Sequence, residues 1–342
     1  MLTLEVDAAR WRDHLSSYVA AHPGIVPVAK GNGYGFGITR LAHEAAALGV
    51  PTMAVGTYNE LSEVTDFPGE RIVLSPWRPS ARGDAFPQVI HTVSRLSDLR
   101  TLANAAGRPS VVVEILTRMR RHGIDPGEIP EAAALLDNVD FRGWALHLPM
   151  TGDRLAEARG VAAALPETAS SPLWVSHLDP ADATTLTAET GIEVRLRVGT
   201  ALWLGARPAL SPQAEVLDVH RLRRGDTFGY RQRNARGDGH LVVVAGGTAH
   251  GIGLEAPTAA STPRQRAVAL ASGGLEAAGR SLSPFSVAGK KRWFAEPPHM
   301  QCSMIWLPGN VTPPELGDTV AVDVRYTTTT FDEIILKNDH VK

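Results

Sequence analysis

The sequence has a single cysteine, Cys302, so no disulfide can form within the chain. It also lacks any run of eighteen or more apolar residues, which argues against a membrane span. Neither charge sign is in excess: 34 Lys and Arg balance 36 Asp and Glu, unlike a surface for nucleic acid. The first fifteen residues carry charges where a signal peptide needs an apolar stretch. We therefore expect a cytoplasmic protein with neither nucleic-acid nor membrane partners.

What the chain does have is regular alternation over its first two hundred residues. Short apolar runs typical of strands alternate with segments rich in alanine and leucine. The predicted strands are Ile25–Lys30, Met53–Thr57, Ile72–Ser75, Ile90–Val93, Val111–Leu116, Gly143–Leu148, Leu173–Leu178 and Val194–Val198, and the predicted helices are Arg40–Leu48, Leu96–Ala106, Ile129–Leu136, Arg154–Leu165 and Ala181–Thr190. This order predicts an α/β fold, a (β/α)8 barrel of the TIM type. A doubly wound sheet is the alternative, and the lack of a phosphate-loop signature favours the barrel.

The pattern changes after about Pro212, where glycine- and proline-rich turns separate short apolar segments. Strands are expected at Leu217–Leu222, Leu241–Ala245, Gln265–Ser272, Met300–Trp306 and Thr319–Val324. We predict two domains, a barrel over residues 1–212 and an all-β domain over residues 213–342.

The first predicted strand ends in a lysine, Lys30, and the loop after it contains four glycines before Ile38. Barrel enzymes place their chemistry at the carboxyl ends of the strands. A lysine there is partly desolvated, which lowers its pKa and makes a Schiff base feasible. The alternative is a solvated lysine before a flexible loop.

The stretch from Lys30 through Tyr34, Gly35 and Gly37 resembles the cofactor-binding motif of the alanine racemase family. The resemblance implies a barrel followed by a β-domain, with pyridoxal 5'-phosphate (PLP) as the cofactor. It also implies that Lys30 forms the Schiff base with PLP and that Tyr34 helps to hold the phosphate.

A second segment, from Arg197 to Gly205, resembles another motif of this family. It implies that Arg197 donates to the pyridine nitrogen of PLP and that Gly199 and Thr200 bind phosphate through backbone N–H groups. A guanidinium does not give up its proton, so the ring would be a weak electron sink, which suits simple proton transfer. A surface arginine is the alternative for Arg197.

Further positions match in the same order along the chain. By resemblance, Arg121 lies near the cofactor hydroxyl and the substrate carboxylate, and His147 stacks on the PLP ring, although a buried structural histidine is the alternative there. The spacing puts Asp182 where the family has a phosphate-binding serine. Because an acid would repel phosphate, Ser176 is the more plausible polar ligand.

The resemblance weakens in the second half, where the family carries a catalytic tyrosine in a glycine-rich turn. Aligning glycines puts Thr248 at the tyrosine, and a hydroxyl is a far weaker acid than a phenol. Two residues further on lies His250, and because an imidazole can exchange protons near neutral pH, it is the predicted second base. A plain turn residue is the alternative for His250.

Other departures lie around the substrate. Met300 keeps the family's methionine that lines the substrate pocket, but Gln301 replaces an aspartate. Phe331 lacks the hydroxyl of a phosphate-supporting tyrosine, and Glu114 stands where a lysine is common.

Together these matches predict a PLP-dependent isomerase, an amino-acid racemase or epimerase acting at Cα through Lys30, with alanine a poor substrate. The family also implies a homodimer with shared active sites. A PLP-dependent decarboxylase or lyase is one alternative, and a PLP-binding protein without catalysis is another. His299 and Cys302 have metal-ligand spacing, but a core cysteine is the simpler explanation, so we expect no metal.

Overall fold

The structure is a computed structural model that describes residues 1–80, 88–166, 171–254 and 281–339. It divides into two compact units, a barrel unit of residues 12–205 and a β unit of residues 1–11 and 206–342. This division differs from the predicted boundary at residue 212, which lies inside strand β10 (Leu210–Leu222). Residues 1–11 join the β unit because β1 (Leu2–Asp7) pairs with β10. None of the described helices is long and apolar enough to cross a bilayer.

The barrel unit contains eight parallel strands in the order β2-β9-β8-β7-β6-β5-β4-β3. They are β2 (Val26–Pro27), β3 (Thr52–Val55), β4 (Glu70–Pro76), β5 (Val89–Val93), β6 (Ser110–Ile115), β7 (Asp140–His147), β8 (Leu173–Ser176) and β9 (Val194–Val198). A bridge between Val28 and Ala54 joins the two ends of this order, and the N–H of Ala29 donates to the Ala54 carbonyl at 2.8 Å. The predicted (β/α)8 barrel is confirmed, and all eight strands predicted between residues 25 and 198 are present.

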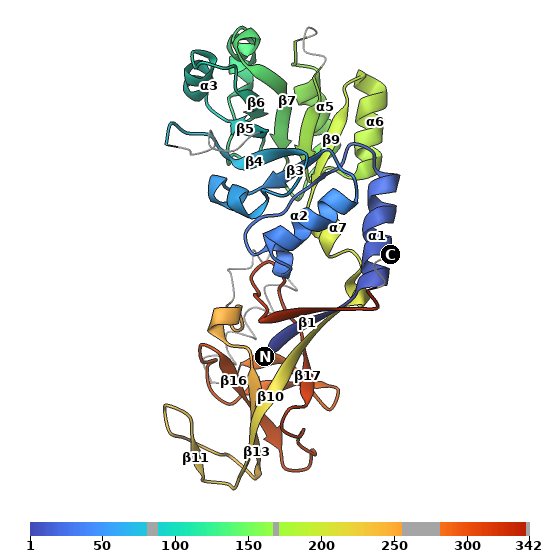
Figure 1. The fold of residues 1–342 in the computed structure, drawn as a ribbon. Coiled ribbons are helices and arrows are strands. Elements are labelled where there is room, and N and C mark those ends of the chain that lie inside the picture. Colours follow the sequence, from blue (N-terminus) through green and yellow to red (C-terminus); the bar gives the residue numbers. More distant parts are fainter. Residues whose placement is uncertain (81–87, 167–170, 255–280, 340–342) are drawn as a thin grey trace. The chain divides into compact units, whose positions relative to one another are not determined.

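Helices connect these strands and lie outside them within the barrel unit (Figure 1). They are α1 (Ala8–Ala21), α2 (Ile38–Ala47), α3 (Leu96–Ala103), α4 (Ile129–Ala133), α5 (Arg154–Ala162), α6 (Pro180–Thr190) and α7 (Thr200–Trp203). Local chemistry sets several of their ends. Helix α5 begins where the Asp153 side chain accepts from the N–H of Ala156, and α6 ends at Gly191 in the left-handed conformation.

The barrel interior is a buried cluster to which seven strands contribute alternate residues. Its members are Val26, Val28, Ala54, Ile72, Ile90, Val112, Ala145 and Trp174, with Leu74 partly buried against them. Because side chains alternate along a strand, residues two positions further on face the same way. Moving two residues on from Val28, Val112, Ala145 and Trp174 leads to the polar set Lys30, Glu114, His147 and Ser176. The strand register therefore gathers polar side chains at the carboxyl-end mouth.

The β unit is an antiparallel sheet in the order β13-β16-β15-β14-β17-β10-β1-β18, in which β18 alone pairs in parallel, with β1. Its remaining strands are β13 (Gly239–Ala245), β14 (Leu282–Val287), β15 (Lys290–Phe294), β16 (Cys302–Pro308), β17 (Thr319–Val322) and β18 (Glu333–Lys337), beside a small hairpin of β11 (Thr227–Phe228) and β12 (Arg233–Asn234). Strand β10 also pairs with β13, which closes six strands around a core that includes Val242, Phe285 and Ile305. The predicted all-β character is confirmed, while the predicted strand Gln265–Ser272 lies outside the described residues.

Gly143 in β7 gives a test of the barrel's packing. It has φ +126°, and a Cβ atom there would lie 2.1 Å from the Pro172 carbonyl oxygen. Gly143→Ala should lower the free energy of unfolding by more than about 2 kcal/mol, because it adds both a clash and backbone strain. Gly160→Ala in exposed α5, where no atom lies within 4 Å, should instead stabilise by about 0.5–1 kcal/mol. Denaturant unfolding of both variants measures the difference, and equal effects would contradict this packing.

Candidate active site

Lys30 comes three residues after the short strand β2, directly after Val28 and Ala29, which bridge to Ala54. The Gly33 N–H donates to its carbonyl at 3.0 Å, which turns the chain sharply away after the lysine. Its pKa is lowered, first because the surrounding protein disfavours the charged amine, and then because Arg121 and Arg197 are nearby. A lowered pKa increases the fraction of neutral amine, the form that attacks a carbonyl.

Glu60 holds the backbone around Lys30 and was not predicted from the sequence as a site residue. Its carboxylate accepts from the N–H groups of Gly31, Gly56 and Thr57 at 3.0, 2.6 and 3.1 Å. A Cβ on Gly56 would lie 3.0 Å from the Cβ of Lys30, so this packing leaves no room for a larger residue. Thr57 and Glu60 form a capping box, and the spacing Thr-x-x-Glu was the sequence signal that could have found them.

Tyr34 and Gly199 come together from separate ends of the barrel sequence. The phenol oxygen of Tyr34 would lie only 1.8 Å from a Cβ placed on Gly199, so glycine is required there. Tyr34 has φ +55°, a strained conformation for this residue, and burial raises its pKa to about 12. At neutral pH the phenol therefore keeps its proton and can donate a hydrogen bond beside the backbone of Gly199 and Thr200, where helix α7 begins.

Arg197 is a buried cation at the end of β9. One guanidinium nitrogen donates to the Leu146 carbonyl at 2.7 Å, while its Nε is buried without a hydrogen-bond partner. Burial lowers its pKa to about 10, against the opposing effect of Glu114, so it remains charged at neutral pH. Glu114 is also buried, and its Oε2 has no hydrogen-bond partner. Burial raises the pKa of Glu114, and the charges of Arg197 and Arg121 oppose that rise.

His147 on β7 and Ser176 on the neighbouring strand β8 are paired in register. The pKa of His147 is lowered to about 3, first by burial and then by Arg121, Arg197, the neighbouring histidine and Lys30. Its ring is therefore neutral at physiological pH. Ser176 is buried and pairs in register with Arg197 on β9.

His177 also belongs to this group, although no site role was predicted for it from the sequence. Its ring contacts the ring of His147 edge-on, with centroids 5.0 Å apart. It has φ +67°, and its pKa is lowered by burial and then by Lys30 and Arg197. A strained backbone at a non-glycine residue beside polar groups is typical of functional sites, but only coordinates can reveal it.

Arg121 completes the set in the barrel unit. Its side chain is exposed, and within the described residues no hydrogen bond or ion pair satisfies it. Its charge is nevertheless felt by Lys30, His147 and Glu114. The structure thus brings together the predicted residues Lys30, Tyr34, Arg121, His147, Ser176, Arg197, Gly199 and Thr200 within the barrel unit.

The predicted residues of the β unit lie in two adjoining turns. His250 is buried in the turn Thr248–His250, where the Gly247 N–H donates to its Nδ1 at 3.2 Å and its Nε2 contacts Asp332 at 3.0 Å. The N–H of Thr248 donates to the His299 carbonyl, and that of Ala249 to the Met300 carbonyl. Met300 is exposed, with 66% of its surface accessible.

Phe331 is partly buried and packs against the β-unit core. His299 contacts the buried Glu296 at 2.5 Å, and Cys302 lies 3.9 Å from its other ring nitrogen. Within the described residues no group of three histidine, cysteine or acidic side chains could hold a metal ion.

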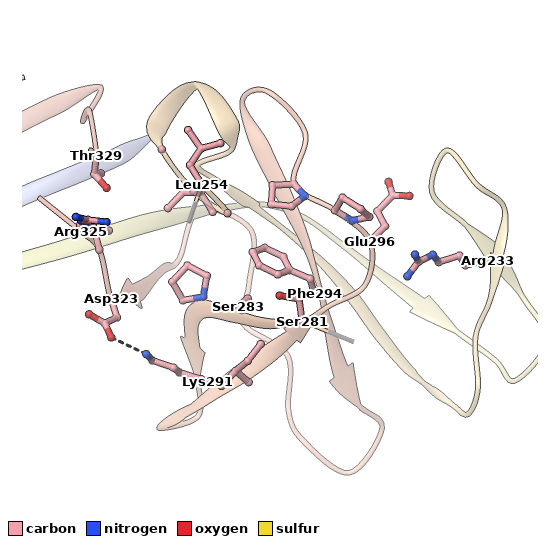
Figure 2. Close-up of a pocket in the computed structure, with 18 of the residues that line it drawn as sticks. Arg233, Leu254, Ser281, Ser283, Lys291, Phe294, Glu296, Asp323, Arg325 and Thr329 are labelled. Atoms are coloured by element: carbon pink, nitrogen blue, oxygen red, sulfur yellow. Dashed lines mark hydrogen bonds and ion pairs between the residues drawn. The ribbon is translucent and has the colours of Figure 1, made fainter. Parts of the chain in front are cut away.

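The β unit also contains a cavity of about 930 Å³. Figure 2 shows its lining, with Phe294, Arg325 and an ion pair between Lys291 and Asp323 at 2.6 Å. None of the residues predicted from the sequence lines it. The barrel mouth carries Lys30, His147 and Arg197, groups with shifted pKa values, so we place the candidate site there rather than in this cavity.

The residues of the barrel mouth fit PLP. Its phosphate needs donors, which the protonated phenol of Tyr34 and the closely packed backbone at Gly199 provide. Its ring nitrogen needs a partner, and the unsatisfied, buried Nε of Arg197 is an available donor. Its aldehyde needs an amine, and Lys30 has a lowered pKa. These features define a barrel enzyme of the PLP-dependent kind.

Comparison with known proteins agrees. The family model described as alanine racemase, N-terminal domain, matches residues 6–207. Alanine racemase of Mycolicibacterium vanbaalenii is 27% identical over 285 residues, covering 70% of each chain, and that of Marinobacter nauticus is 25% identical over 282 residues, covering 75% of this chain and 77% of its own. The chain belongs to the alanine racemase family and is a PLP-dependent isomerase.

Solved structures show the same fold at low identity. Alanine racemase of Bartonella henselae with covalently bound pyridoxal phosphate gives a TM-score of 0.73 at 16% identity, covering 98% of this chain and 99% of that one. Histidine racemase of Leuconostoc mesenteroides subsp. sake gives 0.68 at 18% identity, covering 98% of both.

Lys30 should carry the cofactor. Borohydride reduction of the PLP-loaded protein, followed by peptide mapping, should mark Lys30, because it is the lysine whose pKa the barrel mouth lowers. Lys30→Ala should remove the mark, whereas Lys291→Ala should keep it, since that lysine is ion-paired with Asp323 in the β unit. A mark on any other lysine would refute the assignment.

Proposed function

We propose that the protein is an amino-acid racemase or epimerase that moves the proton at Cα. The observation that carries this proposal is that the site contains both Lys30 and Arg197. Lys30 is an amine of lowered pKa, and Arg197 is a buried guanidinium that keeps its charge. PLP, when bound, makes the Cα–H bond of an attached amino acid acidic. Because Arg197 does not donate a proton to the ring, the site suits proton transfer rather than reactions that need a strong electron sink.

The barrel residues have distinct tasks in this proposal. Lys30 removes or returns the proton on one face of Cα, and the hydrogen bonds of Glu60 to Gly31 and Gly56 keep its backbone in place. Arg121 binds the substrate carboxylate, for which its unpaired guanidinium is suited. His147, kept neutral by burial, provides a flat ring for stacking on the cofactor. Tyr34, Ser176, Gly199 and Thr200 are the proposed phosphate ligands, and Met300 lines the substrate pocket.

Racemisation needs a second proton-transfer group for the other face. Thr248 is a poor one, because a hydroxyl is a much weaker acid than a phenol. His250 is the proposed group, and both nitrogens of its ring already make hydrogen bonds. Its Nδ1 accepts from Gly247 and its Nε2 contacts Asp332, so one of these two hydrogen bonds must open for it to exchange a proton with substrate.

We also propose a cytoplasmic homodimer in which two copies share each active site. Balanced charge and a single cysteine support the cytoplasm, and family membership supports the dimer. A second candidate function is another PLP reaction on this scaffold, decarboxylation or elimination, which Thr248 favours because it supplies no phenol. A PLP-binding protein without catalysis is the weaker alternative, since the β unit would then have no part in its function.

A racemisation screen tests the proposed function. Loaded with PLP and given single enantiomers of the common amino acids, the protein should form the opposite enantiomer of at least one, with deuterium entering Cα in heavy water. Alanine turnover should fall short of an ordinary alanine racemase by about 10²–10⁴-fold, the usual contribution of one positioned acid–base group. Chiral chromatography measures both. Release of carbon dioxide or of elimination products without racemisation would favour the second candidate function.

His250 gives a sharper test of the second base. His250→Ala should lower racemisation in both directions by about 10²–10⁴-fold, because each direction needs both groups. Lys30 should still take up PLP, as borohydride marking would show. His220→Ala is the matched control, since that histidine is exposed on β10 of the same unit. Full activity in His250→Ala would remove His250 from the mechanism.

A further inference from the structure

Arginines lie in the loops that follow three neighbouring strands of the barrel. Arg78 lies two residues past β4, Arg95 two residues past β5, and Arg120 and Arg121 follow β6. Because β4, β5 and β6 pair in parallel and in that order, their carboxyl ends lie side by side. We call Arg95, Arg120 and Arg121 the arginine cluster.

The arginine cluster differs from the other arginines nearby, because those are paired with acidic side chains. Arg78 is ion-paired with Asp98 at 2.8 Å, and Arg118 with Glu157 at 3.1 Å. The three cluster side chains are exposed, and within residues 12–80, 88–166 and 171–205 no hydrogen bond or ion pair satisfies any of their guanidiniums. The cluster is therefore a set of uncompensated positive charges on adjoining loops, and its member Arg121 acts on Lys30.

The effects on His122 support the closeness of these groups. Its pKa is lowered, first by burial and then by Arg121, Arg78 and Arg95 together. Arg121 also acts on Lys30 and His147 in the barrel mouth. Arg121 and Arg95 thus both act on His122, and Arg121 also acts on the groups of the barrel mouth.

The backbone at Arg120 adds an independent observation. It has φ +51°, in the left-handed region that side chains other than glycine rarely adopt, and its N–H donates to the Thr117 carbonyl at 2.9 Å. Glycine would make this turn without strain. A charged residue kept in a strained conformation at the mouth of a site is typical of a functional requirement.

We propose that the arginine cluster binds a second anionic group of the substrate, so that the preferred substrate is an amino acid with an acidic side chain. Arg121 takes the carboxylate at Cα, and Arg95 and Arg120 take the anion at the end of the side chain. The inference rests on the proposed function for the role of the site, but binding can be measured separately. It predicts selection against lysine and arginine as substrates, because like charges would face each other.

Binding of substrate analogues without an amino group tests the cluster directly. Glutarate carries two carboxylates and glutaramate only one, and neither can react with the cofactor. By calorimetry on the PLP-loaded protein, glutarate should bind about tenfold more tightly at low salt, the combined effect of two exposed guanidiniums. The difference should shrink near 1 M salt, where charges are screened within about 3 Å. Including 3-phosphonopropionate distinguishes a phosphate-like side chain from a carboxylate.

Variants of the cluster separate a binding role from a structural one. Arg120→Gly should keep or raise the melting temperature, because it removes strain, yet should abolish most of the preference for glutarate. Arg95→Ala should reduce the same preference, and Arg120→Lys should keep much of it. Arg159→Ala is the matched control, since it removes an ion-paired arginine from helix α5 and should leave the preference unchanged.

The outcomes distinguish this proposal from the proposed function. Equal binding of glutarate and glutaramate, or a preference that survives both Arg95→Ala and Arg120→Gly, overturns the second anion site even if the protein racemises neutral amino acids. A preference lost in both variants supports the site even if no racemisation is found. If the variants change only the oligomeric state, measured by light scattering, the cluster serves an interface between copies and the proposal fails.

Discussion

The alternation of side chains along parallel strands that close into a barrel is the constraint on which the site depends. Glu114, His147, Ser176 and Arg197 lie on different strands and share the inward-facing positions of one register, and Lys30 lies just past the end of β2. A slip of one residue in any strand would turn its polar group outward and its apolar neighbour inward. Since the inner core includes Val112 and Trp174, such a slip would also lose buried apolar contacts, so packing and chemistry select the same register.

Burial of charge at the barrel mouth follows from this register. Arg197 and Glu114 are both buried, and each has an atom without a hydrogen-bond partner. An unsatisfied buried polar group costs about 1–3 kcal/mol, and more when it is charged. Their opposite charges offset part of this cost, and a bound group that satisfies the Arg197 Nε would offset more. A ligand with a hydrogen-bond acceptor at this point would therefore stabilise the folded protein, so stability and binding are linked.

Most of the barrel could be predicted from the sequence because each strand is a short apolar run between helical segments. Strand β1 was missed, although Leu2, Leu4 and Val6 show the alternation of a half-buried strand. Its pairing with β18 could not be predicted, because the two lie at opposite ends of the sequence. In the site, the motifs around Lys30 and Arg197 indicated residues that the structure places at the barrel mouth. Glu60 was detectable from its capping box, whereas His177 depends on a backbone angle that no sequence pattern indicates.

The β unit explains how the reaction can change while the fold remains. The turn that carries Thr248 is held by its backbone, through hydrogen bonds to the carbonyls of His299 and Met300. Gly247 packs so closely that a Cβ would lie 2.1 Å from the His299 oxygen. Glycine and backbone groups therefore fix this turn, and the side chain at position 248 contributes little to it. A substitution there can change the side chain without refolding the unit, whereas the polar residues of the barrel mouth are positioned by the pairing of neighbouring strands.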